Sequence, residues 1–193
     1  MIAIIKYNAG NIRSVINALD RMGIAHVLTD DPEEISSAQK VVLPGVGEAN
    51  TAMKYLRDRG LDKVIQQLAQ PFLGICLGMQ LMFKYSEEND TSCLGLVDEV
   101  VKRFPGGAEK VPHMGWNDFV ETKTPLFDGI ALTDDVYFVH SYYAEVGPDT
   151  IGTTHYIKNF SSAIQKDNFY GVQFHPEKSA DVGQRILENF LRL

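Results

Sequence analysis

Short runs rich in isoleucine, valine and leucine alternate with stretches of helical spacing in the first half of the chain. The runs are residues 2–7, 27–29, 40–43 and 72–75, and the helical stretches are residues 11–22, 49–68 (with a break at Gly60) and 77–85. Within residues 11–22 the apolar side chains share one face: Ile12, Val15, Ile16 and Leu19. This alternation predicts right-handed strand–helix–strand units and a mostly parallel central sheet with helices on both faces.

The second half has a different pattern, in which shorter apolar runs are joined by turns. The expected strands are residues 94–97, 100–104, 119–121, 136–143, 150–156, 163–166 and 170–174. Ser179 is placed to cap a last helix whose apolar stripe is Ile186, Leu187, Phe190 and Leu191. The sequence therefore predicts a three-layer α/β fold with an antiparallel addition in the second half. Because 193 residues fit one compact domain and no linker-like segment interrupts them, we expect a single domain over residues 1–193.

Charge and cysteine content narrow the classes of partner and compartment. The net charge of −7 argues against nucleic acid as the main partner, because phosphate contacts need a basic face. Two cysteines, Cys76 and Cys93, are not a disulfide framework in a chain of this size, which favours a reducing, cytoplasmic location. The apolar run at the N-terminus stops at Lys6, too early for a signal peptide, and no apolar stretch is long enough to cross a membrane.

The segment Gly74-Ile75-Cys76-Leu77-Gly78 lies where an expected strand meets an expected helix. A Gly-x-nucleophile-x-Gly pattern is typical of a tight elbow, in which the glycines remove clashes on either side of a strained nucleophile. The helix N-terminus beneath the sulfur would favour the thiolate, and the amide of Leu77 would be free to bind an oxyanion. The alternative is an ordinary buried cysteine, since cysteine is among the most buried residue types. Cys93 follows a polar stretch and is interpreted as structural.

The segment His175-Pro176-Glu177 supplies the general base that a thiol nucleophile needs. Alternation at the end of a strand would put His175 and Glu177 on the same side, and Pro176 would end the strand pairing. Glu177 could then orient one imidazole nitrogen while the other faces Cys76. The alternative is a surface turn that leads into the last helix. The other histidines have no obvious catalytic partner, and no cluster has metal-ligand spacing, so no metal site is expected.

The glycine-containing loop Pro44-Gly45-Val46-Gly47-Glu48 follows the expected strand at residues 40–43. Ligands of open α/β sheets gather beyond the carboxyl ends of the strands, where this loop and the Cys76 elbow would both lie. One interpretation is a second oxyanion donor, because glycines let backbone amides approach a substrate closely. Another is an ordinary strand-ending turn. Neither nucleotide-binding glycine pattern is present.

Together these three segments resemble the class I, or triad, glutamine amidotransferases. The resemblance covers essentially the whole chain and rests on residues 7–11, 44–47, 74–80, 111–117, 138–143 and 171–179. It implies that the chain binds L-glutamine and hydrolyses it to glutamate and ammonia through a thioester, without a cofactor. Cys76 would be the nucleophile, His175 the proton shuttle and Glu177 its orienting group.

The resemblance also implies the groups that surround glutamine. Amides of Leu77 and of the loop residues Val46 and Gly47 would stabilise the oxyanion, after a change of loop conformation that depends on a partner. The positions that would hold the α-amino and α-carboxylate groups of glutamine are Gln80, Glu88, Ser141 and Tyr142.

Residues 44–47 and 111–117 are similar in particular to the members of this family that work in histidine biosynthesis as a heterodimer with a (β/α)8-barrel cyclase subunit. The resemblance implies that ammonia passes to that cyclase, and that Asn11, Trp116, Tyr137 and Lys178 face it. Alternatively, the two aromatic residues are core side chains and the lysine is a solvated residue at a helix start.

Three other functions stay open. The first is another triad amidotransferase or a γ-glutamyl hydrolase, and the second a non-catalytic thiol redox scaffold of similar fold. The complete set of Cys76, His175 and Glu177 argues against the scaffold, which needs none of the three. The third, a serine-type hydrolase, is disfavoured by the thiol and by the chain order of the three residues.

Overall fold

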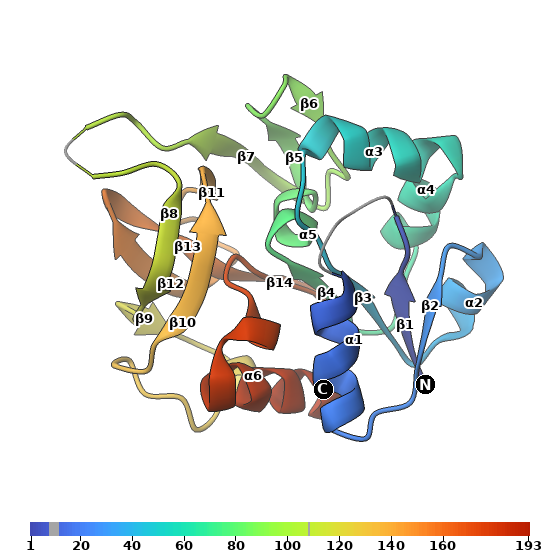
Figure 1. The fold of residues 1–193 in the computed structure, drawn as a ribbon. Coiled ribbons are helices and arrows are strands. Elements are labelled where there is room, and N and C mark those ends of the chain that lie inside the picture. The colour runs from blue at the N-terminus through green and yellow to red at the C-terminus, as the bar shows by residue number, and fades with distance from the viewer. Residues whose placement is uncertain (8–11, 108) are drawn as a thin grey trace.

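The parallel half of the predicted sheet is confirmed. The computed structural model of the chain describes residues 1–7, 12–107 and 109–193, so Asn11 lies outside the described residues. Within these residues one 12-stranded sheet and a two-stranded ribbon are formed. Five parallel strands, in the order β2-β1-β3-β4-β14, make one half of the sheet, with β2 at its edge (Figure 1). They are β1 (Ile2–Ile5), β2 (His26–Thr29), β3 (Lys40–Leu43), β4 (Phe72–Ile75) and β14 (Phe169–Val172).

Helices cover both faces of the parallel strands, as the sequence predicts. On one face lie α1 (Ile12–Arg21) and α6 (Ala180–Arg192), and on the other α2 (Pro32–Ser37), α3 (Ala49–Asp58) and α4 (Leu61–Gln66) (Figure 1). The pleat of β1 divides its side chains between the two cores. Ala3 and Ile5 belong to the core with α2, α3 and α4, and Ile2 and Ile4 to the core with α1 and α6. The three-layer arrangement therefore follows from strands that are apolar on both sides.

The antiparallel addition begins next to β14. Strands β13 (Lys158–Lys166), β11 (Tyr142–Ala144), β7 (Val97–Arg103), β5 (Phe83–Ser86) and β6 (Thr91–Ser92) continue the sheet in that order, and β12 (Thr150–Tyr156) and β9 (Glu121–Thr122) extend it from β13. The separate ribbon pairs β8 (His113–Asn117) with β10 (Val136–His140). It packs on the core through Phe138, whose ring contacts those of Phe160 and Phe174 at centroid distances of 5.7 and 5.8 Å. Two short 3₁₀ helices are η1 (Pro125–Phe127) and η2 (Pro176–Lys178).

Two predicted elements are wrong around the end of the elbow helix. The helix expected over residues 77–85 is only α5 (Leu77–Gln80), because the chain turns at Leu81 and Met82 and continues as β5 beside β7. The strand expected over residues 94–97 is irregular up to Leu96, with a φ of +68° at Gly95, and β7 begins only at Val97.

A third difference shapes the site. The single strand expected over residues 136–143 is interrupted at Ser141. Its first part, β10, belongs to the ribbon, and its second part, β11, pairs with β7 and β13 in the main sheet. The change of sheet places Ser141 and Tyr142 in the wall of a pocket. The strand expected over residues 170–174 differs from the predicted antiparallel arrangement. It is β14, which runs parallel to β4 and joins the parallel strands to the antiparallel addition.

Candidate active site

Cys76 stands at the carboxyl end of β4, on the turn that leads into α5. Its backbone has a φ of +52° and a ψ of −106°, an arrangement that is strained for a residue with a side chain. The flanking glycines make the turn possible. A Cβ on Gly74 would lie 2.6 Å from the carbonyl oxygen of Gly78, and a Cβ on Gly78 would lie 1.9 Å from that of Leu43. The elbow predicted from the sequence is therefore present, and its glycines are required by contact with backbone atoms.

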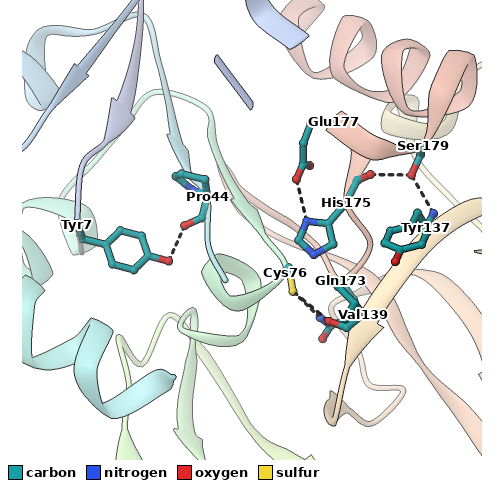
Figure 2. A network of polar contacts seen from close by, with 9 residues as sticks. All are labelled: Tyr7, Pro44, Cys76, Tyr137, Val139, Gln173, His175, Glu177 and Ser179. Carbon is teal, nitrogen blue, oxygen red and sulfur yellow. Dashed lines mark hydrogen bonds and ion pairs between the residues drawn. The ribbon is translucent and has the colours of Figure 1, made fainter. Parts of the chain in front are cut away.

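His175 and Glu177 meet at the end of β14. The Nδ1 atom of His175 lies 2.8 Å from Oε1 of Glu177, and both side chains are 1% exposed. Strand alternation is not what brings them together, because β14 ends at Val172 and Glu177 lies on the 3₁₀ helix η2. Figure 2 shows the imidazole between Glu177 and the sulfur of Cys76. The surface-turn alternative is wrong for this segment, since both side chains are buried.

The environment of His175 favours its protonated form. Burial lowers the pKa of the imidazole, but hydrogen bonds to Cys76 and Glu177 and the negative charges of both groups outweigh this effect and raise the pKa to about 10. The Nε2 atom is buried, and the interaction of the imidazole with the sulfur of Cys76 is one of the causes that raise the pKa of His175. The geometry can therefore hold an imidazolium beside a thiolate.

Ser179 holds the backbone of His175. Its hydroxyl donates to the carbonyl oxygen of His175 at 2.7 Å and accepts from the amide of Tyr137 at 2.9 Å (Figure 2). The amide of His175 in turn donates to the carbonyl oxygen of Tyr137 at 2.9 Å. Ser179 precedes α6, but its side chain makes no capping bond to that helix, so the predicted capping role is wrong. The hydroxyl is used to tie the ribbon to the histidine.

The loop after β3 lies over the elbow. The amide of Leu77, predicted to be free for an oxyanion, instead donates to the carbonyl oxygen of Gly45 at 3.3 Å. The buried hydroxyl of Tyr7 donates to the carbonyl oxygen of Pro44 at 2.7 Å and fixes the start of the loop (Figure 2). A Cβ on Gly45 would lie 1.8 Å from that hydroxyl oxygen. Gly47 has a φ of +131°, in the region that favours glycine.

A pocket of about 290 Å³ opens beside the sulfur. Its volume suits a ligand the size of an amino acid. The pocket is lined by the nucleophile and by all seven residues expected to contact glutamine or the oxyanion. These eight residues are Val46, Gly47, Cys76, Leu77, Gln80, Glu88, Ser141 and Tyr142. Glu88 also accepts a hydrogen bond from the amide of Ala49 at 2.8 Å, and burial is the main cause that raises its pKa. The structure thus brings the elbow, the loop and the broken strand to one hollow.

Gln173 also contacts the nucleophile, although the sequence did not predict it as a site residue. Gln173 is buried two residues before His175, and its amide nitrogen lies 3.6 Å from the sulfur of Cys76. Tyr7 and Ser179 were also missed as residues that fix the loop and the histidine. Tyr7 and Ser179 lie within segments that resemble the family, which was the only indication in the sequence. Hydroxyl contacts between distant segments leave no spacing pattern.

Three of the four residues expected to face a partner form a cluster on the ribbon side of the molecule. Trp116 and Tyr137 are directly opposed across β8 and β10, with ring centroids 5.8 Å apart. The ammonium group of Lys178 lies 5.8 Å from the centroid of the Tyr137 ring. Trp116 is 54% exposed, so it is not a core aromatic residue. We call this cluster of Trp116, Tyr137 and Lys178 the aromatic face.

Two structural absences hold for the described ranges. Among residues 1–7, 12–107 and 109–193, no group of three or more His, Cys, Asp or Glu side chains is placed to hold a metal ion. In the same ranges, no helix has both the length and the apolar character to cross a membrane.

The fold and this site correspond to a known class of protein. Residues 4–193 match the family glutamine amidotransferase class-I, and the chain belongs to this family. Its relatives indicate the particular member. The chain is 55% identical to the imidazole glycerol phosphate synthase subunit HisH of Bacteroides fragilis (strain YCH46), over 100% of the chain and 99% of that relative. It is 48% identical to subunit HisH 2 of Legionella pneumophila (strain Paris), over 100% of the chain and 98% of that relative. A crystal structure of a glutamine amidotransferase shares the fold, with a TM-score of 0.76 at 18% identity over 100% of this chain and 98% of that one.

Proposed function

We propose that the chain is the glutaminase subunit of an imidazole glycerol phosphate synthase. It hydrolyses L-glutamine and passes the ammonia to a (β/α)8-barrel cyclase subunit in histidine biosynthesis. The observation that carries the proposal is the sulfur of Cys76, which lines the pocket and is faced by an imidazole whose other nitrogen is bonded to Glu177. Whole-length similarity to HisH subunits supports the choice of synthase.

Thioester formation uses the groups at the pocket wall. The thiolate of Cys76 attacks the side-chain amide carbon of glutamine, a carbon–sulfur bond forms, and the carbonyl electron pair moves to oxygen. Protonated His175 then gives its Nε2 proton to the amide nitrogen. The carbon–nitrogen bond breaks, ammonia leaves, and a thioester and a neutral imidazole remain. Glu177 keeps the ring oriented through Nδ1.

Hydrolysis of the thioester reverses these roles. A water molecule attacks the thioester carbon while neutral His175 accepts its proton. The carbon–sulfur bond breaks, glutamate is released, and the thiolate–imidazolium pair is restored. The raised pKa of His175 supports this cycle, because the resting enzyme already holds the proton that the first step consumes.

The oxyanion donors would become available only after the loop moves. The amide of Leu77 is engaged by the carbonyl oxygen of Gly45, and this bond must break before the amide can bind an oxyanion. At 3.3 Å the bond is long, so its loss costs little. We place the second donor in the loop at Val46 and Gly47, both of which line the pocket. Such a gate would couple hydrolysis to a bound partner.

Recognition of glutamine uses the remaining walls of the pocket. The carboxylate of Glu88 suits the α-ammonium group, and the broken strand at Ser141 and Tyr142 supplies polar groups for the α-carboxylate. The aromatic face would meet the cyclase, with Trp116 as the main anchor.

Two further parts of the proposal concern the whole chain. We treat residues 1–193 as one amidotransferase domain, because the family match covers residues 4–193 and a single sheet joins β1 to β14. We also place the protein in the cytoplasm, which is supported by the free thiols of Cys76 and Cys93.

The test is glutamate release from glutamine by the purified chain, measured with and without the cyclase subunit and its nucleotide-like ligand. We expect weak release by the chain alone and strong stimulation by the liganded partner. Cys76→Ala should abolish release, His175→Ala should be nearly as severe, and Glu177→Ala milder. Cys93→Ala is the matched control, because Cys93 lies away from the pocket and burial raises its pKa to about 12. No release under any condition, with Cys76 still open to alkylation, would overturn the proposal.

A further inference from the structure

Gln173 is a buried amide in contact with the nucleophile. Its backbone amide donates to the carbonyl oxygen of Ser162 at 2.8 Å, which continues the pairing of β13 with the chain beyond β14. Its side-chain nitrogen lies 3.6 Å from the sulfur of Cys76 (Figure 2). Its side-chain oxygen accepts a hydrogen bond from Nε2 of Gln80 at 2.8 Å. The residue is fully buried, so no solvent competes for these contacts.

The orientation of this amide is fixed by its neighbours. The carbonyl oxygen of Tyr142 can only accept, so the group of Gln80 that lies 2.9 Å from it must be the amide nitrogen. That nitrogen has a second proton, which is directed at Gln173. The atom of Gln173 that meets it must therefore be the oxygen. The nitrogen of Gln173 is left facing the sulfur of Cys76.

Two buried histidines, His113 and His140, also fix the role of the carbonyl oxygen of Tyr142 as an acceptor. The Nδ1 atom of His140 lies 2.8 Å from the carbonyl oxygen of Tyr142, so this nitrogen carries a proton. Burial lowers the pKa of His140 to about 3 and that of His113 to about 4, so both rings are neutral. The Nε2 atom of His140 must then accept from Nδ1 of His113, at 3.0 Å. The carbonyl oxygen of Tyr142 thus accepts from both Nδ1 of His140 and Nε2 of Gln80. A movement of this oxygen away from Gln80 would leave a buried donor unpaired.

The contacts of the sulfur make this donor important. Sγ of Cys76 lies 3.8 Å from the carbonyl oxygen of Val139, which could accept a proton from a thiol. A thiolate has no proton to offer this oxygen, so that contact favours the thiol. An N–H group directed at the sulfur has the opposite effect, because hydrogen bonding to the charged form stabilises that form. Gln173 supplies such a group on a side of the sulfur that is distinct from His175 (Figure 2).

We propose that Gln173 stabilises the thiolate of Cys76 by donating its side-chain N–H to the sulfur, and that Gln80 holds Gln173 in the orientation that allows it. This inference rests on the proposed glutaminase function. It assigns to Gln80 a positioning role within the protein in addition to contact with glutamine. The bond lasts through the resting state and weakens when the sulfur becomes a neutral thioester, so it favours return of the thiolate after hydrolysis.

The test uses Gln173→Glu, which keeps the size of the side chain but replaces the donor by an oxygen. The matched control is Asn189→Asp, since Asn189 is also a buried amide, and its nitrogen donates to the carbonyl oxygens of Leu126 and Asp128 away from the pocket. Both variants lose buried donor bonds, so both should lower the thermal unfolding midpoint. Only Gln173→Glu should slow the reaction of Cys76 with a small neutral methanethiosulfonate reagent, by about tenfold to a hundredfold, the effect of losing a hydrogen bond to a charged group.

Kinetics in the complete synthase give a second measurement. Gln173→Glu should lower kcat for glutamate release by a similar factor and leave KM almost unchanged, and the pH at which the thiol reacts half-maximally should rise. Gln173→Met, which removes the donor without adding an acceptor, serves if the glutamate variant does not fold. Gln80→Leu should slow the thiol reaction less, because Gln173 can then rotate but keeps its donor.

The outcomes separate this inference from the proposed function. An unchanged rate of thiol modification in both Gln173 variants, or an equal loss in Asn189→Asp, would overturn the role of Gln173. A wild-type protein that shows the expected thiol chemistry but releases no glutamate with its partner would overturn the proposed function and leave the role of Gln173 standing.

Discussion

At the scale of single residues, His175 is subject to opposing influences. Burial alone would make its imidazole neutral, but the sulfur of Cys76 and the carboxylate of Glu177 raise its pKa to about 10. The sulfur contributes through both a hydrogen bond and its charge, so its removal should return the pKa toward lower values. We therefore predict that Cys76→Ala lowers the pKa of His175 by more than about one unit, within the range of shifts caused by a neighbouring charge. Nitrogen chemical shifts of the labelled imidazole, followed against pH, measure this. Equal titration in both proteins would contradict the prediction.

The same shift sets how stability depends on pH. The folded-state pKa of His175 lies above the unfolded value of about 6.5. Its stabilising contribution is therefore fully present below about pH 6.5 and is lost as the pH rises toward 10. In Cys76→Ala this loss should be smaller, because the folded-state pKa is closer to the unfolded one. Urea unfolding at several alkaline pH values, compared between the two proteins, tests the difference.

At the scale of elements, the elbow between β4 and α5 depends on the closest backbone approach in the site. A Cβ on Gly78 would lie 1.9 Å from the carbonyl oxygen of Leu43, and neither backbone segment can move without disturbing the parallel sheet. We predict that Gly78→Ala costs more than about 4 kcal/mol of stability or prevents folding, which is the range of severe strain. Gly106→Ala is the control, because a Cβ there has nothing within 4 Å, and it should change stability by less than about 0.5 kcal/mol. Chemical denaturation distinguishes them, and similar values for the two variants would contradict the steric account.

The ribbon of β8 and β10 carries an acid-sensitive pair. Burial lowers the pKa of His113 to about 4 and that of His140 to about 3, below the unfolded value of about 6.5. Between these values the unfolded chain binds protons that the folded chain does not, so stability falls as the pH drops from 6.5, by at most about 1.4 kcal/mol per pH unit for each histidine. The loss continues to about pH 4 for His113 and to about pH 3 for His140. His140→Gln keeps a donor for the carbonyl oxygen of Tyr142 but does not titrate. It should make this loss less steep, as measured by unfolding at several acidic pH values. An unchanged slope would show that other groups cause the acid lability.

Elements with a regular period were predictable and those set by distant contacts were not. The four first strands and the helices around Gly60 follow from apolar runs that are buried on both sides or on one face. The short helix α2 was missed, although Asp31 caps it and Pro32 begins it, because six residues give too little periodicity. The helix after Cys76 was predicted too long, since the spacing of Leu77, Leu81 and Met82 is helical although Leu81 and Met82 form a turn.

The same division applies to the site. Cys76, His175 and Glu177 were predictable because the elbow and the His-Pro-Glu segment are local in sequence. Gln173 and Ser179 were not predicted as part of the site, because their partners lie far away in the chain and the contacts arise only when β14 joins β4. The division of the strand at Ser141 could not be predicted from the sequence pattern either. Both halves are apolar, and they differ only in the strands with which they pair.

At the scale of the whole molecule, the aromatic face lies against the segment that carries His175 and Glu177. The backbone of Tyr137 is tied to His175 directly and through Ser179, and the hollow beside Trp116 is also lined by Glu177 and Lys178. A partner that covered this face would contact β10, whose Tyr137 is hydrogen-bonded to the backbone of His175. The pocket is lined by Val46, Gly47 and Cys76, which follow the carboxyl ends of β3 and β4, and His175 follows the carboxyl end of β14 beside them.

This arrangement leads to a prediction for the complex. Trp116 is 54% exposed, so Trp116→Ala should cost less than about 1 kcal/mol of stability in the isolated chain. Loss of a large aromatic anchor should weaken binding of the cyclase subunit by at least about tenfold, the effect typical of an interface hot spot. Val146→Ala is the matched control, because Val146 is 50% exposed on the turn between β11 and β12. Titration calorimetry with the cyclase, together with glutamate release at saturating partner, measures both effects. If Trp116→Ala binds the cyclase as tightly as Val146→Ala does, the partner meets another surface, and the link from the aromatic face to His175 has no role in stimulation.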